Sequence, residues 1–324
     1  MVSKREPAHH EMHYRHLGKS GLRVSKISLG GWLTLGGTVA EDLSVRMIKL
    51  AFERGVNLFD MADVYSSGQS EVMLGRAARN LPREQLVVAT KVFGRMHPGP
   101  MGAGLSKKHI VEACEASLRR LRMDYIDLYQ FHAYDNDTPL EESLEALDLL
   151  VRQGKVLYVG CSNFNGDQLT EALELSVSGD RPRFISSQPC YNLLERDAEA
   201  TLFPVCRKWG VGNIVYSPLA HGVLTGKYVK GETGPRGSRS DGDGNKFMSR
   251  YLTDDNLERV ARLKKLTDDW GYSMVHLSLA WILRREEVAS AITGATSLEQ
   301  LEHNLAAGDI VLTDSEIEQI EACL

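Results

Sequence analysis

The sequence predicts an α/β protein in which eight parallel strands close into a (β/α)8 TIM barrel, with a β-hairpin before it and extra helices at its C-terminal end. Short apolar segments alternate with longer amphipathic segments, which implies parallel strands joined by helical crossovers. Eight such units can be counted, and eight favour a closed barrel over an open sheet. No composition change or linker divides the 324 residues. We therefore expect a polar tail over residues 1–12 and a single barrel domain over residues 13–324.

The expected strands are short apolar runs that follow turn signals such as Gly55. The first two, Tyr14–Leu17 and Leu22–Val24, flank a glycine-containing turn and predict a hairpin. The eight barrel strands are expected at Lys26–Leu29, Val56–Asp60, Leu86–Lys91, Ile126–His132, Val156–Ser162, Phe184–Gln188, Asn213–Tyr216 and Ala289–Thr293.

The expected helices carry apolar residues at helical spacing, as Val45, Ile48 and Phe52 do in the first. Thr138 before Pro139 predicts a capped helix start, and Thr313 with Glu316 predicts a capping box on a terminal helix. The helices are expected at Ser44–Arg54, Glu71–Arg79, Lys107–Leu121, Pro139–Gln153, Gly166–Leu175, Asp197–Trp209, Asp254–Trp270, Met274–Arg284, Leu298–Ala306 and Thr313–Cys323. Two long loops remain, Val92–Ser106 and a Gly- and Arg-rich stretch over residues 219–250.

The overall composition is that of an ordinary soluble protein, with 43% hydrophobic and 25% charged residues and a net charge of −5. This charge offers no basic surface for nucleic acid, and no apolar run approaches the roughly 20 residues of a membrane span. The N-terminus lacks the apolar core of a secretion signal. Five scattered cysteines fit a reduced, cytoplasmic protein.

A group of histidines in the N-terminal tail raises the question of a metal. Residues His9, His10, His13 and His16 lie close in sequence, but no nearby cysteine or carboxylate set completes four ligands. A solvated terminus is the favoured interpretation, and no metal is expected.

Three of the expected strands end near titratable residues, and the C-terminal edge of a barrel is its catalytic edge. Asp60, Lys91 and His132 end their strands, and Tyr65 follows the first of them. A lysine cation beside a tyrosine lowers the phenol's pKa from about 10, and Asp60 could hold Lys91 as its ion-pair partner. With His132 orienting a substrate oxygen, the set suits protonation of a carbonyl oxygen. Singly, each residue would be read as ordinary packing or capping.

The motifs around these residues are similar to those of the aldo-keto reductases. They are Phe59–Tyr65, Gly68–Glu71, Ala89–Lys91 and Gln130–His132, and the likeness extends over almost the whole chain. Within that family the chain most resembles the potassium-channel β-subunit-like reductases, through Gly21–Gly30, Gly31–Gly37 and Ser217–Ala220. The resemblance implies an oxidoreductase that reduces aldehydes or ketones to alcohols, with hydride from NADPH and a proton from Tyr65 as general acid.

The resemblance also implies where NADP(H) binds. No Gly-x-Gly-x-x-Gly follows the first strand, and the P-loop-like Gly222–Lys227 is one residue short and lacks the required Ser or Thr. Lys227 and Arg239 could pair with a 2′-phosphate, which favours NADP over NAD. By resemblance the cofactor-binding residues are Gly31, Trp32, Ser162, Asn163, Gln188, Tyr216, Ser217, Pro218, Leu219, Ala220, Gly222, Lys227, Arg239, Gly294, Thr296, Gln300 and Asn304.

Some positions depart from the family pattern. His303 stands where an acid usually contacts the adenine, with Glu302 one residue earlier, and Met61 replaces the usual Thr in what we expect to be a packing change. Trp32, Phe93 and Met96 are candidates for the substrate pocket, or alternatively for core at the barrel's top.

Other functions stay open beside the reductase. A redox-sensing or channel-associated regulatory subunit could use the same scaffold, but such β-subunits typically carry Asn where this chain has His132. The likeness to them implies a homo-oligomer such as a tetramer. A metal-dependent barrel hydrolase finds little support, because no His-x-His lies on an early strand.

Overall fold

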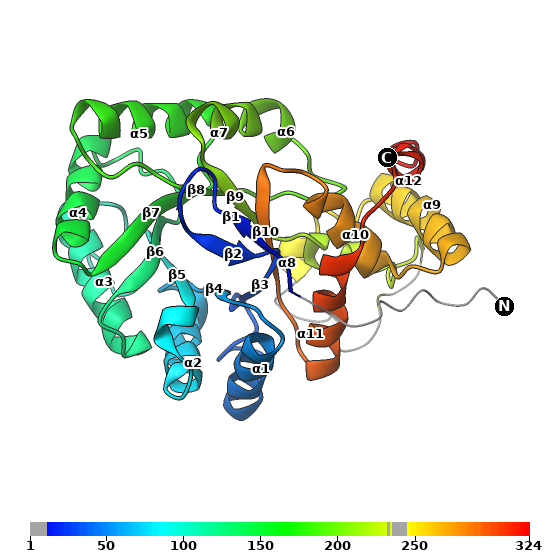
Figure 1. Ribbon diagram of the computed structural model, residues 1–324, viewed down its shortest axis with the longest axis horizontal. Helices are drawn as coiled ribbons and strands as arrows, with labels where there is room; N and C mark the ends of the chain where they lie inside the picture. The colour runs from blue at the N-terminus through cyan, green and yellow to red at the C-terminus, as the bar shows by residue number, and fades with distance from the viewer. Residues whose placement is uncertain (1–11, 232–233, 235–244) are drawn as a thin grey trace.

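The computed structural model describes residues 12–231, 234 and 245–324, and its centre is a closed barrel of eight parallel strands (Figure 1). The strands follow each other around the barrel in chain order, and β10 closes it by pairing with both β9 and β3. The predicted fold class is thereby confirmed. The strands are β3 (Ile27–Gly30), β4 (Leu58–Asp60), β5 (Val87–Val92), β6 (Ile126–Phe131), β7 (Val156–Ser162), β8 (Ser186–Gln188), β9 (Gly212–Val215) and β10 (Val288–Thr293).

Helices that link these strands lie around the outside of the barrel in Figure 1, and further helices gather on the side where the chain ends. The predicted capping box is confirmed on α12, where Thr313 and Glu316 bond reciprocally to each other's backbone N–H. The helices are α1 (Glu41–Glu53), α2 (Gln69–Ala78), α3 (Lys107–Leu121), α4 (Leu140–Arg152), α5 (Gly166–Ser178), α6 (Ala198–Thr201), α7 (Phe203–Trp209), α8 (Asn245–Met248), α9 (Asp254–Trp270), α10 (Met274–Leu283), α11 (Leu298–Leu305) and α12 (Asp314–Glu321), with short 3-10 turns η1 (Tyr65–Gly68), η2 (Arg83–Gln85), η3 (Ala220–Thr225) and η5 (Ala306–Asp309).

Three sequence predictions of local structure were wrong. The helix expected over Asp197–Trp209 is two helices, because Pro204 lies in the first turn of α7 and has no N–H to continue α6. The stretch 219–250 contains η3 and α8. Helix α4 begins at Leu140 with Pro139 as its N-cap, and the Thr138 hydroxyl donates instead to Asp135 at 2.8 Å.

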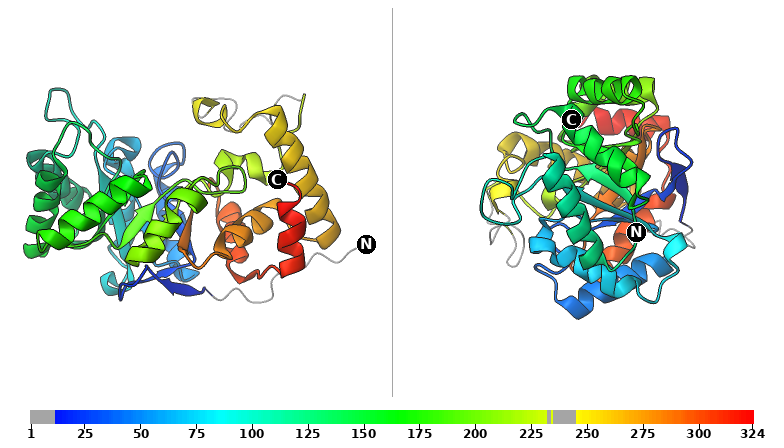
Figure 2. Two further views of the ribbon diagram at one scale, coloured as in Figure 1. Left: turned by 90° about the horizontal axis from the view of Figure 1, so that it is seen from above. Right: turned by 90° about the vertical axis from the view of Figure 1, so that its left-hand side faces the viewer.

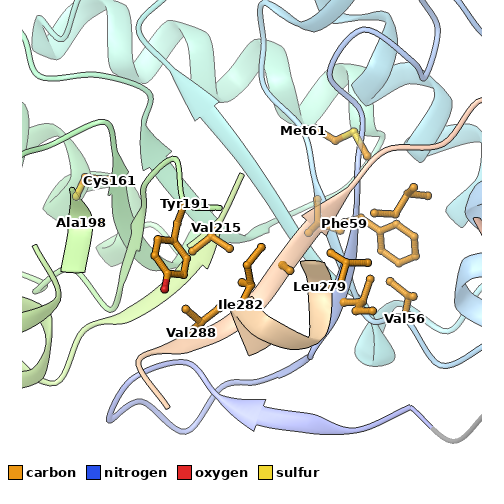
Figure 3. Close-up of a cluster of buried hydrophobic side chains, with 14 of the residues drawn as sticks. Val56, Phe59, Met61, Cys161, Tyr191, Ala198, Val215, Leu279, Ile282 and Val288 are labelled. Carbon is orange, nitrogen blue, oxygen red and sulfur yellow. The ribbon is translucent and has the colours of Figure 1, made fainter. Parts of the chain in front are cut away.

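The hydrophobic side chains form two cores, one outside the sheet and one inside the barrel. The outer core packs the sheet against the helices; Figure 3 shows part of it, with Phe59, Leu279 and Ile282. Met61 also belongs to it, as expected. The smaller interior core consists of Leu17, Val24, Leu58, Val87, Ala89, Leu128, Ile214, Ala289 and Ile292.

The N-terminal hairpin closes one end of the barrel. Its strands β1 (Tyr14–His16) and β2 (Arg23–Ser25) pair antiparallel, which confirms the predicted hairpin. Arg15 donates to the carbonyls of Leu283, Arg285 and Val288, which run from the end of α10 to the start of β10, at 2.7–2.8 Å. In the left view of Figure 2 the hairpin lies at the bottom, and the loops that follow the strands rise at the top. The hairpin therefore seals the N-terminal end and leaves the C-terminal end to the functional loops.

Candidate active site

The alternation of side chains along a strand brings the predicted residues to one end of the barrel. Leu58 and Asp60 both face inward from β4, as Ala89 and Lys91 do from β5, because they are two residues apart. Only the second residue of each pair is charged, and it lies at the strand's C-terminal end. His132 follows β6 directly, and Tyr65 begins η1 after β4.

Lys91 is the centre of the site. Its fully buried ammonium donates to Asp60 Oδ2 at 2.6 Å, to the Met61 carbonyl at 2.8 Å and to the Tyr65 hydroxyl at 3.2 Å. These three acceptors use all three donors of the ammonium. Burial alone lowers the pKa of Lys91, but attraction to Asp60 and Tyr65 outweighs it, and the pKa lies above its ordinary value. The lysine is therefore a fixed cation.

The pKa of Tyr65 corrects a sequence prediction. Lys91 does pull it down, but burial of the phenol is the larger effect, so the pKa of Tyr65 is raised above its usual value. The correction follows from desolvation, which disfavours a buried phenolate and cannot be read from sequence. Because the phenolic oxygen accepts from Lys91, its own proton can point elsewhere. Tyr65 is thus a protonated phenol whose oxygen is held against a cation.

His132 lies against Tyr65, with ring centroids 5.6 Å apart and planes at 73°. Burial, and next the charge of Lys91, lower the pKa of His132 to about 3. The imidazole is therefore neutral at physiological pH, and one ring nitrogen can donate a hydrogen bond to an uncharged oxygen. A cation and two hydrogen-bonding groups thus face the same end of the barrel.

Several predicted cofactor residues join this end through hydrogen bonds. Gln188 donates to Asp60 Oδ1 at 2.8 Å, and the Ser162 hydroxyl donates to the Gln188 carbonyl at 2.8 Å. Asn163 donates to the His132 carbonyl at 2.9 Å and accepts from the Tyr216 hydroxyl at 2.8 Å. One hydrogen-bonded network therefore joins four of the predicted cofactor-binding residues to Asp60 and to the backbone of His132.

The loop after β9 has the backbone of an anion cradle. Ser217, Ala220 and His221 have positive φ angles of 51°, 46° and 56°, and Gly222 follows at 100°. Such conformations are rare outside glycine and collect at functional sites. Successive N–H groups in turns of this kind form concave sites for anions such as phosphates. Pro218 is buried in this loop and Leu219 packs on the outer core. Several of the cofactor-binding residues implied by the resemblance lie in this loop.

The other predicted cofactor residues are spread over two neighbouring regions. Gly294, Thr296 and Gln300 are exposed before and on α11, where the Gln300 amide oxygen accepts from Thr296 N–H at 3.0 Å. Asn304 is buried and donates to the Gly294 carbonyl at 3.3 Å. Gly31 follows β3 and is buried. Arg239 lies outside the described residues.

Glu302 and His303, the two residues that differ from the family pattern at the expected adenine contact, both have partners within the protein. Glu302 pairs with Arg54, the residue that follows α1 directly. The His303 ring stacks on His276, with centroids 4.2 Å apart. The acid expected by resemblance is therefore replaced by a histidine pair.

The predicted substrate-pocket residues are all half-buried, in two separate loops. Trp32 meets His221 and Phe247 edge-on, with ring centroids 5.3 and 5.0 Å away. Phe93 packs against the outer core, which fits the alternative interpretation better. The Met96 N–H donates to the Gly102 carbonyl at 2.9 Å within its own loop.

A second set of buried polar residues lies near Lys91, partly on the outer face of β5, and was not predicted from the sequence. Thr90 faces outward from β5 and donates to Glu71 at 2.6 Å, and Glu71 also pairs with Arg120 at 2.5 Å. Asp63, between Asp60 and Tyr65, is 1% exposed. The only signal was that Asp63 and Glu71 stand inside the quoted motifs; the partners of Glu71 lie 19 and 49 residues away along the chain.

The described part of the chain holds no group of three or more His, Cys, Asp or Glu side chains placed to bind a metal. His9 and His10 are outside that part. Among the described helices, none combines the length and apolar character needed to cross a bilayer.

Comparison with known proteins gives the same class as the fold and site. The model of the aldo/keto reductase family matches residues 26–324. The chain belongs to the aldo/keto reductase family. That membership makes it an oxidoreductase with a nicotinamide cofactor and a small carbonyl substrate.

Curated relatives of two kinds match nearly the full chain. A protein of Arabidopsis thaliana called probable voltage-gated potassium channel subunit beta is 40% identical over 96% of both chains. The L-glyceraldehyde 3-phosphate reductase of Escherichia coli (strain K12) is 36% identical over 96% of this chain and 92% of its own. A putative channel β-subunit of Schizosaccharomyces pombe is also 36% identical. The closer resemblance seen in the sequence is thereby confirmed.

Proposed function

We propose that this protein reduces aldehydes and ketones to alcohols with NADPH, and that Tyr65 supplies the proton. The observation that carries the proposal is the buried Lys91 ammonium shared between Asp60 and the Tyr65 hydroxyl. A carbonyl oxygen that gains negative charge needs a proton and nearby positive or hydrogen-bonding groups. Tyr65, Lys91 and neutral His132 supply these functions at one place.

The roles divide by residue. Tyr65 donates its proton to the carbonyl oxygen, and Lys91 stabilises the phenolate that is left. Neutral His132 donates a hydrogen bond that orients the oxygen, and Asp60 holds Lys91 in place. The bound dinucleotide supplies the hydride, and the chain's task is to orient it.

We also propose NADP as the physiological dinucleotide. Lys227 is exposed beside the positive-φ loop, where its ammonium can reach a phosphate. The seventeen predicted contacts, Arg239 among them, remain part of this proposal, as do Trp32 and Met96 as pocket residues. Comparing the Kd of NADPH and NADH for wild type and Lys227→Met tests it: the variant should lose preference for NADPH, and equal weakening of both would contradict the assignment.

The test of the reaction is NADPH oxidation with an activated aromatic aldehyde, comparing wild type with Tyr65→Phe. Loss of the phenolic proton should lower kcat about 10²- to 10⁴-fold and leave NADPH binding intact. Tyr158→Phe is the matched control, because Tyr158 packs on the interior core four residues before Ser162. Turnover by Tyr65→Phe at the wild-type rate would refute the role of Tyr65.

A regulatory function is the second candidate, favoured by the 40% identity to a protein called a channel β-subunit. Robust NADPH binding with negligible turnover of every carbonyl tested would favour it over the reductase. By the same likeness we propose a homo-oligomer such as a tetramer; light scattering that returned the 36.0 kDa monomer would exclude this. The five free cysteines fit a cytoplasmic location.

A further inference from the structure

Asp63 is a carboxyl group buried beside the candidate active site. It lies in the loop between β4 and η1, three residues after Asp60 and two before Tyr65, and is 1% exposed. Its backbone N–H donates to the Lys91 carbonyl at 3.2 Å, which fixes the loop beside β5. Within the residues that the structure describes, neither carboxyl oxygen makes a hydrogen bond of normal geometry. A buried polar group in this state is rare and calls for an explanation.

The two cations whose charge acts on Asp63, Lys91 and Arg120, are already engaged by other carboxylates. Lys91 is bonded to Asp60 Oδ2 at 2.6 Å. Arg120, from α3, is bonded to the fully buried Glu71 of α2 at 2.5 Å and also donates to Ser117 at 3.1 Å. Three carboxyl groups therefore share two cations, and Asp63 is the one without a direct pair.

An unpaired buried carboxylate is costly, so the neutral acid is favoured. Burial, and next the charge of Glu71, raise the pKa of Asp63 to about 7, although the Val64 N–H, Arg120 and Lys91 oppose the rise. The hydroxyl groups of Tyr65 and of Tyr129, on β6, are the other titratable groups that feel its charge. Asp63 therefore changes charge within the physiological pH range.

We propose that Asp63 is a positioning residue that makes proton donation by Tyr65 depend on pH. When Asp63 is neutral, the field at Tyr65 is set by Lys91 and Asp60. When Asp63 loses its proton to water, a negative charge appears beside the Lys91–Tyr65 pair and holds the phenolic proton more tightly. Reduction then slows as pH rises through neutrality. This inference rests on the proposed carbonyl reduction and adds a regulator to it.

The test compares kcat for aldehyde reduction at saturating NADPH, from pH 5.5 to 8.5, in wild type and Asp63→Asn. Asparagine keeps the size of the side chain but cannot ionise. A change of about one unit in the pKa of Tyr65 is a tenfold change in its acidity, and the rate of proton donation changes by no more than the acidity does. For wild type we therefore expect kcat at pH 6 to exceed kcat at pH 8 about three- to tenfold. For Asp63→Asn the ratio should fall to near one.

Glu71→Gln is a second variant, and it should shift the pH dependence of kcat and not abolish it. Removing the Glu71 charge frees Arg120 to pair with Asp63, so the midpoint of the wild-type decline should shift to lower pH. A merely structural role for either residue would lower kcat equally at all pH values and would not move the midpoint.

Each outcome decides the matter. An inflection near pH 7 that persists in Asp63→Asn, or a uniform loss of rate, would overturn the inference. If wild type reduced no carbonyl, the proposed function would fail, but the titration of Asp63 would still be tested by stability. The Tm of Asp63→Asn relative to wild type should then rise between pH 5 and 8; a difference independent of pH would overturn the inference by itself.

Discussion

The two ends of the barrel interior differ in composition although the same strands build both. At the N-terminal end Leu58, Val87 and Leu128 form a sealed apolar core under the hairpin. Two or four residues further along these strands stand Asp60, Lys91 and His132. Every second side chain of a strand points into the barrel. Along each of these strands the inward-pointing side chains change from apolar to titratable, so one end of the interior stabilises the fold and the other carries the chemistry.

Strained backbone is also concentrated at the C-terminal end of the barrel. Among the described residues other than glycine, all those with positive φ except Arg122 and Asp180 lie in loops that follow barrel strands. These include Ser66 after Tyr65, Asn163 after β7 and Ser217 after β9. Strained backbone and buried charge both cost stability and collect where function requires them. The N-terminal end and the outer core offset that cost.

The largest effect should come from replacing Lys91 by methionine. Methionine leaves Asp60 as a buried carboxylate without its cation, which should lower the free energy of unfolding by about 3–5 kcal/mol. It also removes the cation beside Tyr65, so kcat should fall by at least about 10²-fold. Chemical denaturation and NADPH oxidation measure the two effects separately.

The double variant Asp60→Asn/Lys91→Met is the control, because it removes both charges. Most of the lost stability should return, since no unpaired charge is left behind, while activity should stay low. Recovery of activity together with stability would mean that Lys91 acts only through folding, and the division between the two ends would be wrong.

The sequence predicts those features of the site that depend on neighbouring residues, but not those that depend on residues far apart in the chain. The end residues Asp60, Lys91 and His132 were predictable because they terminate apolar runs, and the spacing puts them on one edge. The bond from Gln188 to Asp60 joins residues 128 positions apart, and the pair of Arg120 and Glu71 spans 49. Such contacts exist only once the barrel closes.

The same reasoning accounts for the wrong predictions. Burial of Tyr65 depends on the closed barrel, and it reverses the pKa shift expected from Lys91 alone. The break between α6 and α7 had a local signal in Pro204, which the apolar spacing of the segment obscured. Element types were predictable from local pattern, whereas electrostatics required the assembled fold.

An effect of intermediate size is expected at the apolar end, from Leu128→Ala. Removing a fully buried leucine from the interior core should lower the free energy of unfolding by about 2–5 kcal/mol. Because Leu128 belongs to the interior core and lies four residues before His132, kcat measured well below the Tm should stay within about twofold. A tenfold loss of kcat in a fully folded variant would show that the two ends are coupled.

The smallest effect, and the sharpest comparison, concerns the pH dependence of stability at His132. The folded protein keeps this imidazole neutral down to about pH 3, whereas an unfolded histidine gains its proton below about pH 6.5. In that window the unfolded state binds more protons, so stability falls as pH falls. Glutamine cannot be protonated, so His132→Gln should gain about 2 kcal/mol of unfolding free energy relative to wild type from pH 7.5 to pH 5.

Denaturation of both proteins at the two pH values cancels the opposite contribution of Asp63, which both retain. A constant difference would mean that His132 becomes charged inside the barrel, and a charged imidazole beside Lys91 would contradict its role as a neutral hydrogen-bond donor.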